Sequence, residues 1–219
     1  MRKNTFSEYD NPKDLNQGIQ EKGILTREAA INTILKRWSN TDSFFVGTTG
    51  KTSRELFELR VERGESHNRD FLTVGGMGHA ISIATGISMN APTKTIVCLD
   101  GDGSLLMHTG SLVSTTTYGS KQLVHIVLNN GIHDSVGGQP TLINNVNYCD
   151  LSSSMGYKTT HKVEDDESLK KAFEITQNKS GPHFIEFLIK SGSRKNLGRP
   201  TIKPFDNLRE LQHGLSKDI

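Results

Sequence analysis

The residues with the clearest chemical potential lie in two short polar segments, each directly after an apolar run. Residues 101–104 (GDGS) follow the run 95–100 (TIVCLD), and Asn129 and Asn130 come 28 and 29 residues after position 101. Continuous apolar runs are typical of buried parallel strands, and glycines mark the turns that end them. A carboxylate from Asp102 and an amide oxygen from Asn130 could therefore converge on one hard cation. All-oxygen ligation suits Mg²⁺, which usually also binds the phosphate oxygens of a ligand.

A simpler interpretation of the same residues stays open at this point. Aspartate and asparagine beside glycine are common in turns that bind nothing, and short motifs also match by chance. The ligand interpretation explains more, because Gly101 and Gly103 would let backbone N–H groups approach phosphate oxygens closely. The neighbouring loops provide further evidence on whether these residues bind a ligand.

The first loop, residues 48–55 (TTGKTSRE), combines a glycine turn with two cations. Thr52 and Glu55 have the spacing of a capping box, which predicts that a helix begins here. A helix N-terminus after a glycine turn is a ready anion site, and Lys51 and Arg54 would add positive charge to it. The alternative is that both cations are simply solvated at the surface.

The second and third loops supply further candidate groups. In the second loop, residues 75–79 (GGMGH), Gly75 would allow close backbone approach and Met77 is either an adaptable apolar wedge or ordinary core. The third loop, residues 129–141 (NNGIHDSVGGQPT), places His133 and Asp134 beside the proposed ligand Asn130. An isolated histidine–aspartate pair is usually a surface turn. Three such loops at one sheet edge instead predict a functional site.

The elements that position these loops alternate along the chain. We expect strands at 43–48, 71–74, 94–99, 123–128, 158–163 and 183–189, with helices from Thr26 and over 52–62, 77–89, 105–118 and 165–178. This alternation predicts an α/β fold, a doubly wound and mostly parallel sheet with helices on both faces. In such sheets ligands bind outside the carboxyl ends of the strands, where the three loops lie.

Composition excludes several classes of function. The net charge is +2 without a basic run, so nothing indicates a nucleic-acid partner or a membrane surface. No apolar stretch approaches the length of a membrane span, and the polar start is unlike a signal peptide. Cys98 and Cys149 lack metal-ligand spacing, and Cys98 is expected to be a core thiol. We expect a cytoplasmic protein.

Four segments together carry a family resemblance: 48–58 (TTGKTSRELFE), 75–80 (GGMGHA), 101–110 (GDGSLLMHTG) and 127–141 (VLNNGIHDSVGGQPT). Over about residues 26–190 the chain resembles the diphosphate-binding domain of thiamine diphosphate-dependent decarboxylases. The resemblance is closest to the phosphonopyruvate decarboxylase family, because the sulfopyruvate decarboxylase and acetolactate synthase groups diverge in the last segment. It implies decarboxylation of 3-phosphonopyruvate to phosphonoacetaldehyde and CO₂.

The resemblance also implies residue roles and the cofactors thiamine diphosphate and Mg²⁺. The Gly75 carbonyl would accept a hydrogen bond from the cofactor's amino group, and Met77 would force its bent conformation. His133 and Asp134 would face the substrate as catalytic residues, and Lys51, Arg54 and His133 would bind its anionic groups. The remaining assignments are Mg²⁺ ligation by Asp102, Asn130 and the Ile132 carbonyl, and diphosphate binding by Gly50, Lys51, Thr52, Gly103 and Ser104.

One expected part is missing. Relatives in the family carry a pyrimidine-binding domain that supplies an activating glutamate, whereas here a polar arm or linker (1–25) precedes the main domain (26–205) and a tail (206–219) follows. The chain is therefore expected to hold half an active site, as a subunit or a fragment, and to be inactive alone. A pyrimidine-binding partner or α subunit and an oligomeric state follow from this.

Two alternatives of other classes remain. A catalytically silent thiamine diphosphate-binding subunit would bind Mg²⁺ and cofactor without ever releasing CO₂. An ordinary nucleotide-binding domain ranks lower, because its G-x-G-x-x-G turn is absent after the first strand, which ends in TTGKTS.

Overall fold

A computed structural model describes residues 23, 25–38, 42–141 and 146–216. The expected arm at 1–25 lies almost entirely outside the described residues. The elements in chain order are α1 (Arg27–Trp38), β1 (Ser43–Gly47), α2 (Lys51–Glu62), β2 (Asp70–Leu72), α3 (Ala80–Asn90), β3 (Thr95–Gly101), α4 (Asp102–Met107), α5 (Ser111–Tyr118), β4 (Leu123–Asn129), α6 (Tyr148–Ser154), β5 (Thr159–Val163), α7 (Asp166–Asn178), β6 (His183–Leu188) and α8 (Pro204–Ser216).

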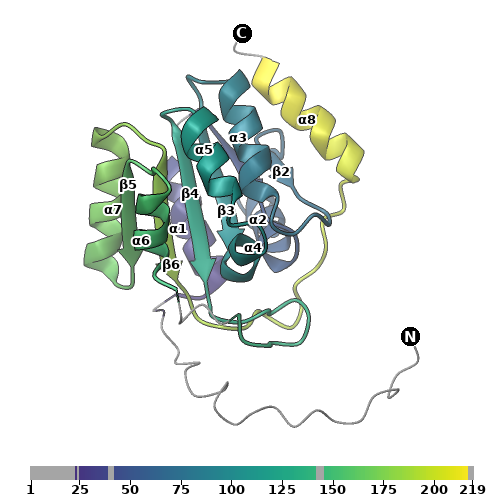
Figure 1. Cartoon of the computed structure of the whole chain (residues 1–219). Coiled ribbons are helices and arrows are strands. Elements are labelled where there is room, and N and C mark those ends of the chain that lie inside the picture. Colours follow the sequence, from purple (N-terminus) through teal and green to yellow (C-terminus); the bar gives the residue numbers. More distant parts are fainter. Residues whose placement is uncertain (1–22, 24, 39–41, 142–145, 217–219) are drawn as a thin grey trace.

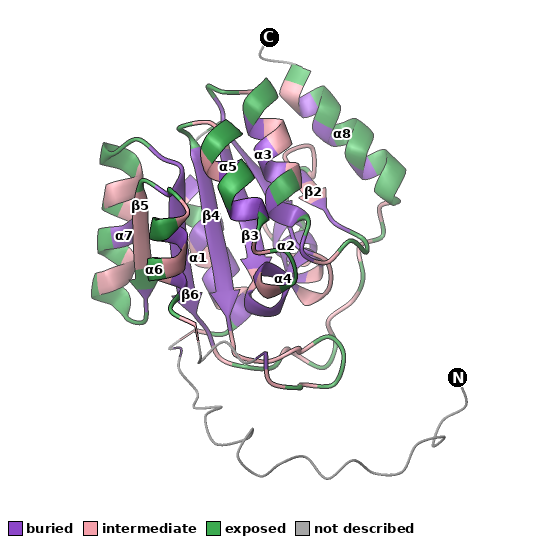
Figure 2. Cartoon of the chain, in the orientation of Figure 1, coloured by how far each residue is buried: buried purple, intermediate pink, exposed green. Residues whose placement is uncertain are grey.

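The six strands form one parallel sheet in the order β2-β1-β3-β4-β6-β5 (Figure 1). Strands β1, β4 and β6 are buried at every position, as Figure 2 shows for the centre of the sheet. That burial on both faces is why these strands are mainly apolar in the sequence, although β4 also buries His125 and β6 buries Glu186. The predicted doubly wound α/β class is confirmed.

Alternating strand residues feed two separate layers of core. Phe45 packs with α1, α2 and α7 on one face, whereas Phe44 and Val46 pack with α3 and α8 on the other. A third cluster, around Val127 and Phe184, joins α4, α5 and α6 to that second face. Helices therefore cover both faces of the sheet.

The chain reverses its direction of travel across the sheet between β1 and β3. From β1 it leads through α2 on one face, and from β3 it leads through α4 on the other. The loops after these two adjacent strands diverge, which opens a crevice at their carboxyl ends. The first loop and the GDGS turn flank that crevice.

Several element predictions need correction. The helix expected over 105–118 is two helices, α4 and α5, separated at His108–Gly110. The helix expected from 77 begins at Ala80, because the second loop continues through three positive-φ glycines. Helices α6 and α8 were not predicted. The segment 206–219 was expected as a tail, yet most of it belongs to α8, which buries Leu211 against the sheet.

The capping box expected at Thr52 and Glu55 is wrong. Helix α2 has Gly50 at its N-cap without any side-chain cap, and the Glu55 carboxylate binds the Arg27 guanidinium instead. None of the helices in the described part of the chain combines the length and the apolar character that a bilayer-spanning helix needs.

Candidate active site

A cavity of about 240 Å³ lies at the carboxyl ends of the central strands. The three loops and the GDGS turn meet there, as the sequence predicts. It is lined by Arg27, Thr48, Thr49, Gly50, Lys51, Thr52, Met77, Gly101, Asp102, Gly103, Ser104, Leu128, Asn130, Ile132, His133, Asp134, Ser135 and Val136. Every candidate residue is in this lining except Gly75 and Arg54.

The first loop presents free backbone donors to the cavity. Gly50 has φ 101°, and an added Cβ would lie 2.7 Å from the Ser135 hydroxyl oxygen, so a side chain there is both strained and crowded. Because α2 has no side-chain cap, its first N–H groups are left for a ligand. An anion beside Lys51 and Thr52 would satisfy them and interact favourably with the helix dipole.

Ser104 joins the loops around this anion site. Its hydroxyl lies 3.1 Å from the Thr48 hydroxyl and accepts a 3.0 Å hydrogen bond from the Gly78 N–H. Gly103 lies under the His133 imidazole, since an added Cβ would be 2.4 Å from its Cε1 atom. A glycine at position 103 is therefore required by the packing of the third loop, and the Ser104 hydroxyl links the first and second loops.

Asp102 is a buried carboxylate whose pKa is shifted strongly. Burial raises its pKa to about 6, although hydrogen bonds lower it in part. Its Oδ2 accepts from the Thr141 hydroxyl at 2.5 Å and from the Gly131 N–H at 3.1 Å. The Tyr148 hydroxyl donates to its backbone carbonyl at 2.8 Å. A buried carboxylate of this kind is costly unless a cation balances its charge.

Only the second residue of the asparagine pair lies in the cavity. The Asn129 amide, still on β4, turns to the buried Glu186 carboxylate at 2.7 Å. Asn130 donates from Nδ2 to Asp134 at 2.9 Å, and its Oδ1 accepts from the Ile132 N–H at 3.2 Å. An amide oxygen has a second lone pair, so Asn130 Oδ1 can still bind a cation.

The donor set fits a hard divalent cation beside a diphosphate. Asp102, Asn130 and Ile132 offer a carboxylate, an amide oxygen and a backbone carbonyl in one cavity lining. This is the all-oxygen environment that Mg²⁺ prefers, and the cation would stabilise the ionised form of buried Asp102. The uncapped start of α2 faces the same cavity and suits the phosphate groups.

Of the remaining candidate residues, Met77 lines the cavity, whereas Gly75 and Arg54 lie outside its lining. Met77 is half-buried and lines the cavity, whereas Gly75 is exposed and donates its N–H to the Thr49 hydroxyl at 3.0 Å. Arg54 is half-buried outside the lining residues. The structure therefore brings Lys51 and His133, but not Arg54, into the cavity lining.

Several residues of the site were not singled out from the sequence. Arg27 is 6% exposed, lines the cavity and pairs with Glu55 and Asp134. Thr48 and Thr141 hold Ser104 and Asp102, respectively. Thr48 lies inside a quoted motif, but Arg27 follows the helix-capping Thr26 and carries no local signal. Only its contacts with residues far along the chain reveal its role.

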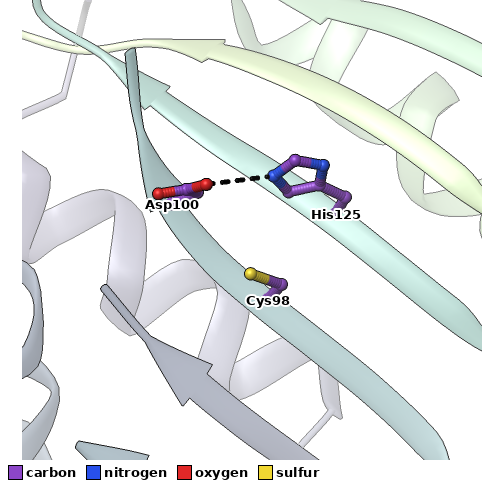
Figure 3. A group of neighbouring side chains, drawn as sticks. All are labelled: Cys98, Asp100 and His125. Carbon is purple, nitrogen blue, oxygen red and sulfur yellow. Dashed lines mark ion pairs between the residues drawn. The ribbon is translucent and has the colours of Figure 1, made fainter. Parts of the chain in front are cut away.

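A buried polar cluster supports the strand that leads into the GDGS turn (Figure 3). Figure 3 shows the His125 imidazole directed at the Asp100 carboxylate, with Nε2 and Oδ2 3.4 Å apart. His125 Nδ1 lies 2.9 Å from the Tyr157 hydroxyl, and Asp100 Oδ1 accepts from the Gly101 N–H. Cys98 is buried in the core, as predicted, and this burial raises the pKa of its thiol well above the ordinary value.

Comparison with known proteins gives matches to the sequence and to the fold of this chain. The sequence model described as "Thiamine pyrophosphate enzyme, C-terminal TPP binding domain" matches residues 46–187. A phosphonopyruvate decarboxylase of Streptomyces viridochromogenes is 36% identical over 187 residues, which are 85% of this chain and 45% of that protein. The chain thus spans about half the length of the phosphonopyruvate decarboxylases that it matches.

Two further similarities extend the picture. The sulfopyruvate decarboxylase subunit beta of Methanothermobacter thermautotrophicus is 30% identical over 69% of this chain and 76% of its own length. The structure of a thiamin diphosphate-dependent enzyme described as putative, from Mycobacterium smegmatis, has a TM-score of 0.58 and 19% identity, covering 77% of this chain and 32% of that one. At that identity the structural match supports the fold alone.

Proposed function

This chain belongs to the family of thiamine pyrophosphate enzymes, because it matches the family's TPP-binding domain. We propose that it is the diphosphate- and Mg²⁺-binding half of a 2-oxo acid decarboxylase. The reaction is the conversion of 3-phosphonopyruvate to phosphonoacetaldehyde and CO₂. The observation that carries the proposal is the convergence of Asp102, Asn130 and the uncapped start of α2 on one cavity.

Most of the residues predicted from the sequence have a binding task in this proposal. Asp102, Asn130 and the Ile132 carbonyl hold Mg²⁺, which bridges to the diphosphate. The diphosphate lies against Gly50, Lys51, Thr52, Gly103 and Ser104. Met77 would support the middle of the cofactor, and the Gly75 carbonyl, outside the cavity lining, would accept a hydrogen bond from the cofactor's amino group. When bound, thiamine diphosphate supplies the electron sink for the electron pair released as CO₂ leaves.

The substrate is proposed from two donor side chains in the cavity lining and from the relatives. Phosphonopyruvate carries a carboxylate and a phosphonate, and Lys51 and His133 are two donors in the lining that could bind them. His133, in the third loop, also lies over Gly103 of the GDGS turn. A sulfopyruvate decarboxylase activity is the second candidate, because a β subunit of such an enzyme aligns over most of its own length.

A pyrimidine-binding domain is proposed to complete the site and to supply the activating glutamate. Two findings support a partner: the chain aligns with 45% of the Streptomyces relative, and the Methanothermobacter relative is named as a subunit. The partner domain would belong either to another chain or to a longer form of this protein. A cytoplasmic location and a hetero-oligomeric assembly complete the proposal.

Two measurements test the proposal. Calorimetry should detect Mg²⁺-dependent binding of thiamine diphosphate and none of NAD or ATP. Release of CO₂ from phosphonopyruvate, sulfopyruvate and pyruvate should then require a pyrimidine-domain protein, with phosphonopyruvate preferred. Cofactor binding without CO₂ release beside any such partner would instead identify a silent binding subunit. Strong turnover by this chain alone would contradict the divided active site.

A further inference from the structure

The Asp134 carboxylate accepts hydrogen bonds from three residues and lies near a fourth, cationic one. Its Oδ2 accepts from Arg27 Nη1 at 3.1 Å and from Asn130 Nδ2 at 2.9 Å. The Gly192 N–H donates to both carboxylate oxygens, at 3.1 and 3.3 Å, and Lys51 Nζ lies 4.0 Å from Oδ1. The side chain is only 10% exposed. A carboxylate so engaged is an acceptor in a rigid network rather than a mobile proton carrier.

Arg27 anchors this network from the N-terminal helix. Its guanidinium donates to both oxygens of the buried Glu55 carboxylate, at 2.9 and 3.2 Å, and to the Gly192 carbonyl at 3.2 Å. Burial raises the pKa of Glu55, and the Arg27 charge offsets that rise in part. Both Arg27 and Gly192 lie outside residues 46–187, the part that the family model matches. The network therefore joins α1 and the segment after β6 to the third loop.

The network decides which atom of the Asn130 amide is available to a cation. An ionised carboxylate only accepts hydrogen bonds, so Asp134 requires the NH₂ group of Asn130 on its side. The Oδ1 atom is then turned the other way, where it accepts from Ile132, the next proposed ligand. A neutral group at position 134 would no longer impose this orientation.

We propose that Asp134 and Arg27 are positioning residues that orient Asn130 for Mg²⁺ and so set the selectivity of the site for Mg²⁺ over Ca²⁺. The inference rests on the proposed Mg²⁺ site and gives Asp134 a task other than the catalytic one expected from the sequence. Mg²⁺ demands near-ideal octahedral geometry at short distances, whereas Ca²⁺ accepts flexible coordination. A loosened Asn130 should therefore weaken Mg²⁺ binding far more than Ca²⁺ binding.

The test compares Asp134→Asn with the wild-type chain and with a matched control. Glu28→Gln removes the 2.9 Å ion pair from Glu28 to Arg194, which also links α1 to the segment after β6 but does not contact Asp134. Calorimetry with thiamine diphosphate measures the concentration of Mg²⁺ or Ca²⁺ that gives half-maximal cofactor binding. For Asp134→Asn we expect a rise of about 10- to 100-fold with Mg²⁺, typical of lost outer-shell support, and a much smaller rise with Ca²⁺. Glu28→Gln should match the wild type.

Arg27 is tested together with its second partner, because Arg27→Gln alone would leave buried Glu55 without its cation. The double variant Arg27→Gln/Glu55→Gln removes both charges and should show the same loss of Mg²⁺ preference. Equal losses with Mg²⁺ and Ca²⁺, or unchanged half-saturation with both, would overturn the positioning role. Failure of the wild-type chain to bind cofactor with either metal would instead refute the proposed function itself.

Discussion

Replacing Asp102 by Asn should stabilise the metal-free protein at neutral pH while abolishing metal-dependent cofactor binding. Burial raises the pKa of Asp102 from 3.8 to about 6, so the folded state holds its proton more tightly than the unfolded state. Stability from this group is therefore present below about pH 4 and is lost as the pH rises to about 6. Two pKa units correspond to roughly 3 kcal/mol. Asparagine keeps an acceptor for Thr141 and Gly131 but carries no charge.

The assay is urea unfolding of both proteins in EDTA between pH 4 and pH 7.5. The Asp102→Asn variant should be more stable than wild type by up to about 3 kcal/mol at pH 7.5, and the difference should shrink toward pH 4. With Mg²⁺ and thiamine diphosphate the order should reverse, because only the wild-type protein gains binding free energy. A stability difference that does not change with pH would refute the reasoning, as would equal stabilisation of both proteins by cofactor.

Three further changes separate site from scaffold. Met77→Ala should weaken cofactor binding in calorimetry, yet cost less than the roughly 2–5 kcal/mol of a core truncation, because Met77 is only half-buried. Gly50→Ala should cost about 1–3 kcal/mol in urea unfolding and impair cofactor binding, because φ is 101° there. Its control Gly86→Ala, in open space within α3, should do neither. Tyr157→Phe should cost about 1–3 kcal/mol by removing the hydroxyl partner of buried His125, with the metal half-saturation unchanged. Equal loss of stability for the two glycine variants, or a neutral Tyr157→Phe, would contradict these assignments.

The sequence by itself determined the fold class and most of the cavity lining. Buried parallel strands need apolar residues on both faces, so β1, β4 and β6 are visible as mainly apolar runs. Motifs such as GDGS are contiguous, and parallel topology brings the carboxyl ends of all strands to one edge. Asp102, Asn130 and the first loop were therefore predictable together. Helix α8 was missed, although its leucines at 208, 211 and 215 have helical spacing.

Only the tertiary structure decided which neighbour each polar side chain binds. The sequence alone does not distinguish Asn129 from Asn130. In the structure Asn129 is the last residue of β4 and its amide contacts Glu186, whereas Asn130 follows the strand and lines the cavity. Arg27 contacts Asp134 across 107 positions of sequence, and Glu55 leaves its local capping role for that same arginine. Local spacing describes only nearby partners. Long-range ion pairs depend on how helices and loops pack. A buried charge costs free energy unless it is paired, so each one binds the partner that the fold places beside it.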